Sequence, residues 1–512
     1  MPKNAYLFAI DQGTTGTTVL ILSCNKDIVV IGKANCEFTQ HYPQKGYVEH
    51  DLEQIWASFE KAAKLALKQA KDQDKNFSPN KIAAIGITNQ RETLAVFARK
   101  TLKPKRKAIV WQDKRSTDIC KQLNAENLAP LIKEKTGLLI DPYFSGTKIK
   151  WLLENDDALA KEITKGNVIL STIDCYLLAK LTKGEAIYTE PSNASRTLLM
   201  DLKKGAWDQE LLRVFGLPNQ DCLPEIKNSV DNFGQTKGIG FLPDGIPIQA
   251  MLGDQQAALA GQGCYEPGLA KCTYGTGSFL LIQNGQQLRY SQKGMLTTVA
   301  WSIDNKLSYA LEGSAFIAGA SIQFLRDQLL LVKNASESEE LAAKETAAPF
   351  IYFVPALAGL GAPYWNPNAR GAFLGLSRDT SKGQLIRAAL EAMAFQVYDL
   401  VKTAELETKL PLKALRVDGG AVANNLLLQI QANLLGKEVQ RPQIIETTSY
   451  GAAIFAGLGA GIFGSLAELA GISRIEQTFS PDLKHQDACK QMIKGWQQAI
   501  DAVLLFAQGK KD

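Results

Sequence analysis

Residues 6–22 read YLFAIDQGTTGTTVLIL, and residues 269–282 read LAKCTYGTGSFLLI. In each stretch an apolar, strand-like run enters a turn rich in Gly and Thr, and a second apolar run leaves it. Glycine lets the backbone approach a ligand, and consecutive backbone N–H groups in such a turn form an anion-binding concavity. A single turn of this kind is usually only a hairpin. Two of them, one in each half of the chain, predict two lobes that hold one polyphosphate between them.

The bulk composition describes an ordinary globular protein. The chain has 512 residues, 46% of them hydrophobic and 21% charged, which is enough for two or more domains. A net charge of +5 is too small to indicate a nucleic-acid partner. The eight cysteines contain no CxxC pair and the three histidines are far apart, so no structural zinc site is expected. Reduced thiols and the lack of a secretory signal pattern predict a cytoplasmic protein.

The uncharged stretch Thr447–Ala467 is long enough to raise the possibility of a membrane span. Glycines recur through it, and no other segment resembles it, so we expect a helix buried between layers and no membrane span. It contains a G-x-G-x-x-G pattern at Gly459, Gly461 and Gly464 without a preceding strand, which we interpret as the end of a helix and not as a dinucleotide site. A phosphate-binding G-x-x-x-x-G-K-[ST] motif is absent from the sequence.

Short strand-like runs alternate with longer amphipathic runs, which predicts an α/β fold. The expected strands are 6–10, 19–22, 82–88, 94–97, 109–111, 280–282 and 415–417, and the expected helices are 52–69, 148–153, 314–331, 382–403 and 424–435. A cluster of small residues at Gly253–Gly268 precedes the second Gly/Thr turn. We therefore expect one domain over residues 1–262 and another over residues 263–512.

A third glycine turn lies in residues 415–425, LRVDGGAVANN. A strand ends there, and a helix begins within a few residues and ends near Gly436. Glycine in such a turn lets a ligand reach the N-terminus of the helix. Alone it is an ordinary strand-to-helix turn, but beside the two hairpins it becomes a candidate adenosine site.

Asp254 lies in small and apolar surroundings, in residues 250–261, AMLGDQQAALAG. A carboxylate in such a place either caps a helix, here one over residues 256–260, or has a function. The functional interpretation is a general base that takes a proton from a substrate hydroxyl during phosphoryl transfer.

Polar groups also follow two apolar strands and suit a ligand with neighbouring hydroxyls. Residues 87–93, ITNQRET, place Arg91 beside Glu92, and Trp111 closes the next strand. Tyr143 precedes a helix whose cap is expected at Ser145 or Thr147. Trp and Tyr side chains are usually core or walls, and as walls of a small polyol pocket they would pack on carbon atoms.

Together these residues resemble the glycerol kinases within the FGGY family of sugar and polyol kinases. The resemblance covers at least residues 9–457 and rests on motifs that follow the family's order: DQGTT (11–15), GYVEHD (46–51), ITNQRET (87–93), IVWQ (109–112), TGLLIDPYFSGTKIKW (136–151), SNASRT (192–197), GDQQAAL (253–259), YGTG (274–277), GAPYW (361–365) and DGGAVANN (418–425). ITNQRET with WQ, DPYFSGTK and GDQQAAL are specific to glycerol phosphorylation. The resemblance implies two ribonuclease-H-like lobes, as in actin-like ATPases, with the nucleotide and substrate in the cleft between them.

The resemblance also implies a role for individual residues. Glycerol would contact Thr14, Arg91, Glu92, Trp111, Tyr143, Asp254, Gln255 and Phe279, with Asp254 as the general base. ATP would contact Thr14, Thr15, Gly16, Thr18, Thr276, Gly319, Gln323, Gly420 and Asn424. Asp11 would serve Mg²⁺.

The implied activity is ATP- and Mg²⁺-dependent phosphorylation of glycerol to sn-glycerol 3-phosphate in glycerol uptake and catabolism, by a homodimer or homotetramer. Two alternatives remain open: a kinase for another polyol or a ketose, and a non-catalytic nucleotide-binding regulator. Two departures from the family pattern stand out. The first turn of the family commonly ends in Ser-Ser-Arg, whereas Gly16, Thr17 and Thr18 stand here. Residues 238–245, GIGFLPDG, lack the Arg of a fructose 1,6-bisphosphate loop, so we expect no inhibition by that compound.

Overall fold

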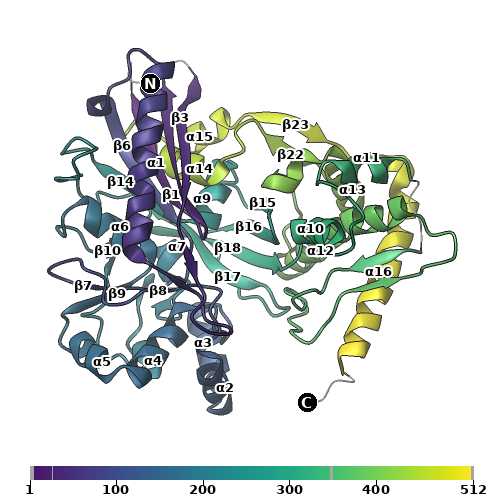
Figure 1. The fold of residues 1–512 in the computed structure, drawn as a ribbon, viewed down its shortest axis with the longest axis horizontal. Helices are drawn as coiled ribbons and strands as arrows, with labels where there is room; N and C mark the ends of the chain where they lie inside the picture. Colours follow the sequence, from purple (N-terminus) through teal and green to yellow (C-terminus); the bar gives the residue numbers. More distant parts are fainter. Residues whose placement is uncertain (1–4, 26, 346–349, 509–512) are drawn as a thin grey trace.

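The computed structural model describes residues 5–25, 27–345 and 350–508. Its larger strands form two sheets, one in each half of the molecule (Figure 1). The first sheet has the order β14-β6-β1-β2-β3. Its strands are β1 (Tyr6–Gln12), β2 (Gly16–Cys24), β3 (Ile28–Glu37), β6 (Ile82–Asn89) and β14 (Ile248–Gly253). Strands β1 to β3 form an antiparallel meander, and β6 and β14 continue the sheet in parallel.

The second sheet repeats this plan. It has the order β17-β18-β16-β15-β21-β22-β23. Its strands are β15 (Leu269–Tyr274), β16 (Ser278–Gly285), β17 (Leu296–Ile303), β18 (Lys306–Ala315), β21 (Ala414–Asp418), β22 (Val439–Pro442) and β23 (Ile475–Phe479). Strands β15, β16 and β18 are antiparallel neighbours, with β17 on the far side of β18, and β21 and β22 continue the sheet in parallel. Both halves of the chain therefore build the lobe topology that the two Gly/Thr hairpins predict.

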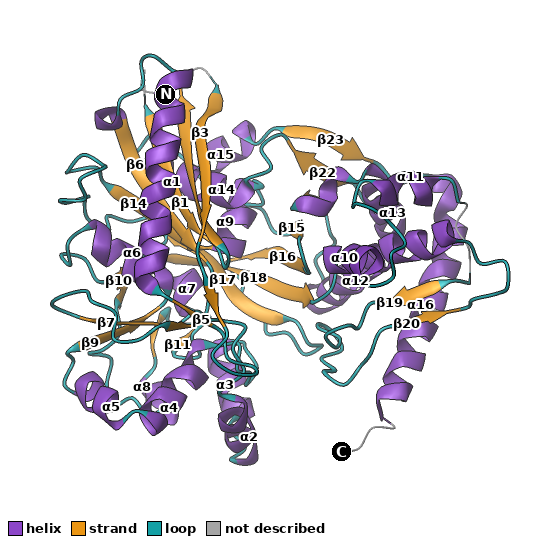
Figure 2. Ribbon diagram, viewed as in Figure 1, coloured by secondary structure: helices purple, strands orange, loops and turns teal. Residues whose placement is uncertain are grey.

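Long amphipathic helices cover the sheets (Figure 2). In the first half α1 (Leu52–Gln73) packs on β2 and β3, and in the second half α12 (Lys382–Thr408) packs on β16 and β18. The other helices are α2 (Thr117–Ala125), α3 (Ala129–Thr136), α4 (Ser145–Asn155), α5 (Asp157–Thr164), α6 (Ile173–Leu181), α7 (Pro191–Ala194), α8 (Gln209–Val214), α9 (Asp254–Gly261), α10 (Gly319–Asp327), α11 (Glu337–Ala343), α13 (Asn425–Leu435), α14 (Thr447–Gly459), α15 (Leu466–Ile472) and α16 (Gln486–Gln508). Within the described part of the chain, no helix combines the length and apolar character that a membrane crossing needs.

The remaining strands are short, and most of them lie in the first half of the chain. They are β4 (Gln40–His41), β5 (Glu49–His50), β7 (Ala95–Ala98), β8 (Ala108–Ile109), β9 (Val168–Ser171), β10 (Tyr188–Thr189), β11 (Met200–Asp201), β12 (Ala206–Trp207), β13 (Glu225–Ile226), β19 (Tyr352–Val354) and β20 (Ala372–Leu374). These strands pair in small sheets of two or three.

Helices α9 and α14 join the two halves. Helix α14 follows β22 of the second sheet, yet it packs on α9 and on β1, β6 and β14 of the first sheet. Glycines allow the close approach: a Cβ added at Gly451 would overlap the carbonyl oxygen of Ala257, and one at Gly261 would overlap that of Thr447. Gly86 of β6 similarly receives the backbone of Ala452. Because the segment crosses between the sheets in this way, the domain boundary expected at residue 262 stays a prediction.

Part of the second half is anchored by a buried carboxylate. Asp399 of α12 accepts hydrogen bonds from Trp496 Nε1 at 2.7 Å and from Tyr364 Oη at 2.9 Å. Trp496 of α16 is fully buried and stacks on Phe395, with ring centroids 5.1 Å apart. Burial raises the pKa of Asp399 to about 6, although the two hydrogen bonds lower it. The contact holds the C-terminal helix on α12.

The eight cysteines are all buried and none forms a disulfide. Burial raises the pKa of Cys24, Cys120 and Cys264 to about 12, so these thiols stay protonated at neutral pH.

Most expected elements are present, but two differ. The strand expected over 109–111 ends at Ile109 of β8, so Trp111 lies in the turn that follows. The stretch Thr447–Ala467 does contain a buried helix, α14, and Gly459 and Gly461 lie at its end. The helix expected over 314–331 is wrong at its start, because Ser314 belongs to β18 and pairs with Phe279 of β16. The helix begins only at Gly319, where the chain leaves the sheet. The pattern of apolar residues there suits a buried strand and a helix equally well.

The glycine contact between α9 and α14 predicts a specific loss of stability. In Gly451→Ala the added methyl group has to displace the α9 backbone, and we expect the free energy of unfolding to fall by about 1–3 kcal/mol. Gly471→Ala in α15 is the matched control, since its Cβ would meet nothing within 4 Å. Urea unfolding followed by circular dichroism measures both. An equal, small change in the two variants would contradict the close-packing argument.

The buried Asp399 predicts a pH-dependent stability. Its pKa is raised in the folded protein, so the unfolded chain releases its proton first, and stability present at low pH is lost as the pH rises through about 6. Asp399→Asn stays neutral, and we expect it to gain about 1–3 kcal/mol over the unsubstituted protein at pH 8, and less at pH 5. Unfolding midpoints at both pH values test this, with the exposed Asp501→Asn as control. A gain that does not change with pH would refute it.

Candidate active site

The candidate site forms where parallel strands of the first sheet end. Asp254 directly follows β14, Arg91 and Glu92 follow β6, and Asp11 lies near the end of β1. These three strands are neighbours in the sheet and run in the same direction. Their carboxyl ends therefore meet at one edge, which is where open α/β sheets bind ligands. The sequence places these residues far apart, and the sheet order brings them together.

An aromatic wall lies beside this edge. Trp111 donates from Nε1 to Thr14 Oγ1 at 2.9 Å, which ties the wall to the first Gly/Thr turn. The ring of Tyr143 meets that of Trp111 edge to face at 5.6 Å. The Arg196 guanidinium lies 5.7 Å from the centre of the Tyr143 ring, so the wall continues into a charged cluster.

The charged cluster is almost completely buried. Arg91 Nε lies 3.1 Å from Asp254 Oδ1. The two terminal nitrogens of Arg91 donate hydrogen bonds to Glu312 at 2.5 and 3.0 Å. Arg196 donates from Nε to Glu92 Oε1 at 2.6 Å and from Nη2 to Glu312 Oε1 at 3.0 Å. The exposed fractions of Arg91, Glu92, Arg196 and Glu312 are 3% or less. Because each charge has an opposite partner, the cluster can stay ionised away from water.

Glu92 also adopts a strained backbone conformation. Its φ is 59°, in the left-handed region that non-glycine residues rarely occupy. The carbonyl oxygen of Glu92 accepts a hydrogen bond from Ser145 Oγ at 3.0 Å, which holds this conformation. Strained backbone of this kind gathers at ligand sites, where the surrounding structure fixes it.

Gln255 and Phe279 complete the expected polyol set. Gln255 follows Asp254 in α9, and its side-chain oxygen accepts a hydrogen bond from the buried Lys271 of β15. Phe279 lies on β16, one residue before a Leu280–Leu281 run that is fully buried in the sheet. Through these two residues the second half of the chain reaches the site.

The structure supports neither the capping interpretation of Asp254 nor the cap expected at Ser145 or Thr147. The cap position of α9 is held by Gly253, and Asp254 is the first residue of the helix, where its carboxylate accepts from Gln255 N at 2.6 Å and pairs with Arg91. Ser145 is likewise the first residue of α4, after Phe144 at the cap. Its hydroxyl binds Glu92 instead of capping the helix, and that of Thr147 bonds the Phe144 carbonyl. These side chains therefore contact other protein groups and do not cap the helices.

Asp11 has the character of a cation ligand. Burial raises its pKa to about 7; the hydrogen bond from Ser449 Oγ at 3.0 Å lowers it, and the nearby Asp254 carboxylate raises it further. A cation beside the carboxylate would favour its charged form. Among the described residues, no group of three or more His, Cys, Asp or Glu side chains is arranged to hold a metal. One carboxylate fits Mg²⁺, which usually takes its remaining ligands from phosphates and water.

The five residues expected around the adenosine line a single cavity of about 480 Å³. It lies between the β15–β16 turn, α10 and the start of α13, and its lining includes Thr276, Gly319, Gln323, Gly420 and Asn424. Asn424 caps α13 through a hydrogen bond from Leu427 N at 2.9 Å. The third glycine turn thus faces the second hairpin across a space of the size that small ligands occupy.

The remaining residues of the first turn lie outside that cavity's lining. Thr15 is exposed at the tip of the turn, and Gly16 is buried, where an added Cβ would come within 2.9 Å of the Cys36 carbonyl oxygen. Thr18 lies directly opposite Asp11 in the β1–β2 pairing, and its hydroxyl accepts a hydrogen bond from Asn35 Nδ2 at 2.9 Å. The structure therefore places the Asn35 amide beside Thr18. The nucleotide role of these three residues stays a prediction.

Several site residues did not emerge from the sequence. Glu312 and Arg196 belong to the charged cluster, Lys271 binds Gln255, and Arg326 and Glu339 line the nucleotide cavity. Arg196 lies within the quoted SNASRT motif, and Glu312 is a lone carboxylate in the apolar run YALEGSAF. An acid in such a run is a signal, because buried carboxylates need partners.

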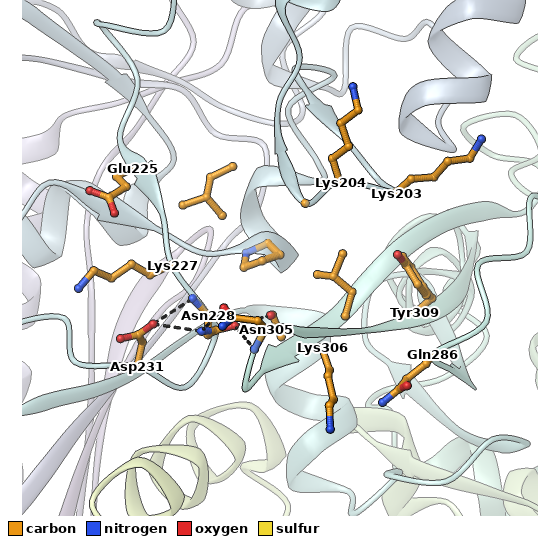
Figure 3. Close-up of a pocket in the computed structure, with 15 residues that line it drawn as sticks. Lys203, Lys204, Glu225, Lys227, Asn228, Asp231, Gln286, Asn305, Lys306 and Tyr309 are labelled. Atoms are coloured by element: carbon orange, nitrogen blue, oxygen red, sulfur yellow. Dashed lines mark hydrogen bonds between the residues drawn. The ribbon is translucent and has the colours of Figure 1, made fainter.

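A further cavity of about 620 Å³ shares no lining residue with these sites. Lys203, Lys204, Lys227 and Lys306 border it, and Figure 3 shows their amino groups pointing away from one another. Lys227 donates to the Asn232 carbonyl oxygen at 2.8 Å. Since its cations do not converge, this cavity offers no focused anion site.

Comparison with known proteins identifies the family of this chain. The model of the FGGY family of carbohydrate kinases, N-terminal domain, matches residues 6–261, and that of the C-terminal domain matches residues 270–460. The chain belongs to the FGGY family of carbohydrate kinases. This FGGY kinase is 48% identical over 496 residues to a glycerol kinase from Carboxydothermus hydrogenoformans, with 97% of each chain covered. It is 47% identical over 503 residues to a glycerol kinase from Myxococcus xanthus, covering 98% of this chain and 100% of the relative.

Solved structures share the fold of this FGGY kinase. A glycerol kinase of Plasmodium falciparum with ADP matches with a TM-score of 0.91 and 34% identity, covering 98% of this chain and 99% of the other. A gluconate kinase from Lactobacillus acidophilus matches with a TM-score of 0.87 at 21% identity and 98% coverage of both, which shows the fold alone. The predicted family and the α/β fold of two ribonuclease-H-like lobes are confirmed.

The expected nucleotide role of the 480 Å³ cavity predicts a selective binding defect. A Cβ at Gly420 would meet nothing within 4 Å, so a larger side chain there fills the cavity without a clash with the protein. We expect Gly420→Val to weaken ADP binding about tenfold or more, which corresponds to about 1.4 kcal/mol, and Gly420→Ala to have a smaller effect. Calorimetric titration with ADP measures this, and glycerol binding is the internal control. Unchanged ADP affinity in Gly420→Val would place the nucleotide elsewhere.

Proposed function

We propose that this FGGY kinase transfers the terminal phosphoryl group of ATP to glycerol and forms sn-glycerol 3-phosphate. The observation that carries the proposal is the connected cluster of Arg91, Glu92, Trp111, Tyr143 and Asp254 at the edge of the first sheet. It offers charged donors and acceptors for neighbouring hydroxyls and aromatic faces for the carbon atoms of a small polyol. The two glycerol kinases at 48% and 47% identity support the same substrate.

In the proposed reaction Asp254 acts as the general base. Its carboxylate accepts the proton of the reacting glycerol hydroxyl while the hydroxyl oxygen bonds to the terminal phosphorus of ATP. The bond from that phosphorus to the bridging oxygen breaks, and ADP leaves. Arg91 holds the Asp254 carboxylate at 3.1 Å, which fixes the direction of proton transfer.

The other proposed contacts come from the family resemblance. Arg91, Glu92, Tyr143 and Gln255 would bind hydroxyls, and Trp111 and Phe279 would pack on carbon atoms. The adenosine would occupy the 480 Å³ cavity, with the phosphates extending toward Thr14 and Thr15. Asp11 would hold Mg²⁺, which when bound neutralises phosphate charge.

The setting of the enzyme is also a proposal. Eight buried cysteines without disulfides support a reducing, cytoplasmic compartment. A homodimer or homotetramer is proposed from the family resemblance. Leu505 and Phe506 of α16, which are 70% and 65% exposed, are apolar side chains available to a second copy.

The general-base role predicts a large and selective loss of rate. Asp254→Asn keeps the shape of the side chain but cannot accept the proton, so we expect kcat to fall by roughly 10²–10⁴-fold. Release of ADP from MgATP with glycerol measures kcat, and calorimetric ADP binding shows that the variant is folded. A variant that keeps more than about a tenth of the kcat would remove Asp254 from this role.

The same assay on the unsubstituted enzyme separates the candidate functions. A high rate with glycerol and low rates with xylulose, ribulose, gluconate and erythritol support the proposal. Preference for one of the other acceptors would identify a different polyol or sugar kinase. ADP binding without turnover on any acceptor would identify a non-catalytic nucleotide binder.

A further inference from the structure

One carboxylate connects both arginines of the candidate site. Glu312 Oε2 lies 2.5 Å from Arg91 Nη1, and Glu312 Oε1 accepts from Arg91 Nη2 and from Arg196 Nη2, each at 3.0 Å. Arg91 in turn holds Asp254, and Arg196 holds Glu92 at 2.6 Å. Glu312 is therefore one contact removed from two carboxylates that the proposed reaction uses.

The place of Glu312 in the second sheet makes this contact unusual. It lies on β18, directly opposite Leu281 of β16, whereas Arg91 and Asp254 follow strands of the first sheet. Phe279 of β16 is two residues from Leu281, so it projects from the same face of the sheet as Glu312. The second half of the chain thus contributes an apolar wall and a buried anion to the same site.

The Glu312 carboxylate balances the charge of both buried arginines. Burial alone would raise the pKa of Glu312, but Arg196 and Arg91 outweigh it and bring the pKa to about 2. The carboxylate is thus ionised at neutral pH. Without its charge, both buried guanidinium groups would have to find other partners, and Asp254 and Glu92 are the anions next to them.

Neighbouring groups restrict how the arginines can respond. Gln256 Oε1 accepts from Arg91 Nη1 at 3.3 Å, and Gln256 itself is fixed by its donation to the Val299 carbonyl oxygen at 3.0 Å. Arg196 is fully buried, and its guanidinium lies 5.7 Å from the centre of the Tyr143 ring and 5.3 Å from that of Phe144. A change at Glu312 therefore passes through Arg91 to its ion pair with Asp254, and through Arg196 to its hydrogen bond with Glu92.

We propose that Glu312 is a positioning residue for phosphoryl transfer, which acts through Arg91 and Arg196 to orient Asp254 and Glu92 toward the polyol. This inference rests on the proposed glycerol kinase function. It assigns to the second sheet a share in aligning the reacting hydroxyl, in addition to nucleotide binding. A misplacement of about 1 Å in such an arrangement is enough to cost about 10²-fold in rate.

The test compares Glu312→Gln with a matched control. Glu391→Gln also removes a buried carboxylate, 3% exposed, from an ion pair with Arg387 at 2.8 Å, but that pair lies on α12 and includes no residue of the candidate site. We expect Glu312→Gln to lower kcat with glycerol by about 10²-fold and to leave the ADP dissociation constant within about twofold. Glu391→Gln is expected to keep kcat within about twofold, even if its unfolding midpoint falls as far as that of Glu312→Gln.

Further measurements keep the proposal falsifiable. If Glu312→Gln does not fold, Glu312→Asp keeps the charge but shortens the reach, and we expect it to lose about tenfold in kcat with unchanged ADP binding. Folded Glu312→Gln or Glu312→Asp with the kcat of the unsubstituted enzyme would overturn the proposal. So would an equal loss of kcat in Glu391→Gln, which would show a general effect of stability. Glycerol turnover by the unsubstituted enzyme is measured in parallel, so failure of the proposed function is recognised separately.

Discussion

The structure depends on the contact between α9 and α14. Each helix follows a strand of a different sheet, and Gly451 and Gly261 let their backbones touch. Asp254 stands at the start of α9, and Ser449 near the start of α14 binds Asp11. The packing that joins the two halves therefore also sets the positions of the groups expected to act on substrate and metal. A shift of either helix would move those groups.

Buried charge is the second constraint on the site. Two arginines and two glutamates, with exposed fractions of 3% or less, form one connected set of ion pairs from both halves of the chain. Such a set is costly to bury and gives no large gain in stability, but it holds each group in one direction. The strained backbone of Glu92 fits the same view, since local strain is tolerated where alignment matters more than stability.

Local patterns in the sequence predicted the strands, the glycine turns and the residues at the strand ends, because those depend on neighbours along the chain. They did not predict Glu312, whose partners lie 221 and 116 residues away and meet it only through the sheet register. The cap expected from Ser145 failed for the same reason, since its hydroxyl has a tertiary partner in Glu92. The apolar surroundings of Ser314 suit the period of a helix and that of a strand, so the sequence pattern predicts a helix there. Pairing with β16 decides for the strand.

The eight buried thiols have a consequence for how the molecule can be observed. Cys264 and Cys272 have no exposed surface, and burial raises the pKa of Cys264 to about 12, so thiol reagents reach these two residues only when part of the protein opens. Cys264 follows α9, and Cys272 lies on β15 before the second Gly/Thr turn. The labelling rate of each sulfur, measured by mass spectrometry, thus reports transient opening between the lobes at that residue. No cysteine has to be introduced into the chain for this measurement.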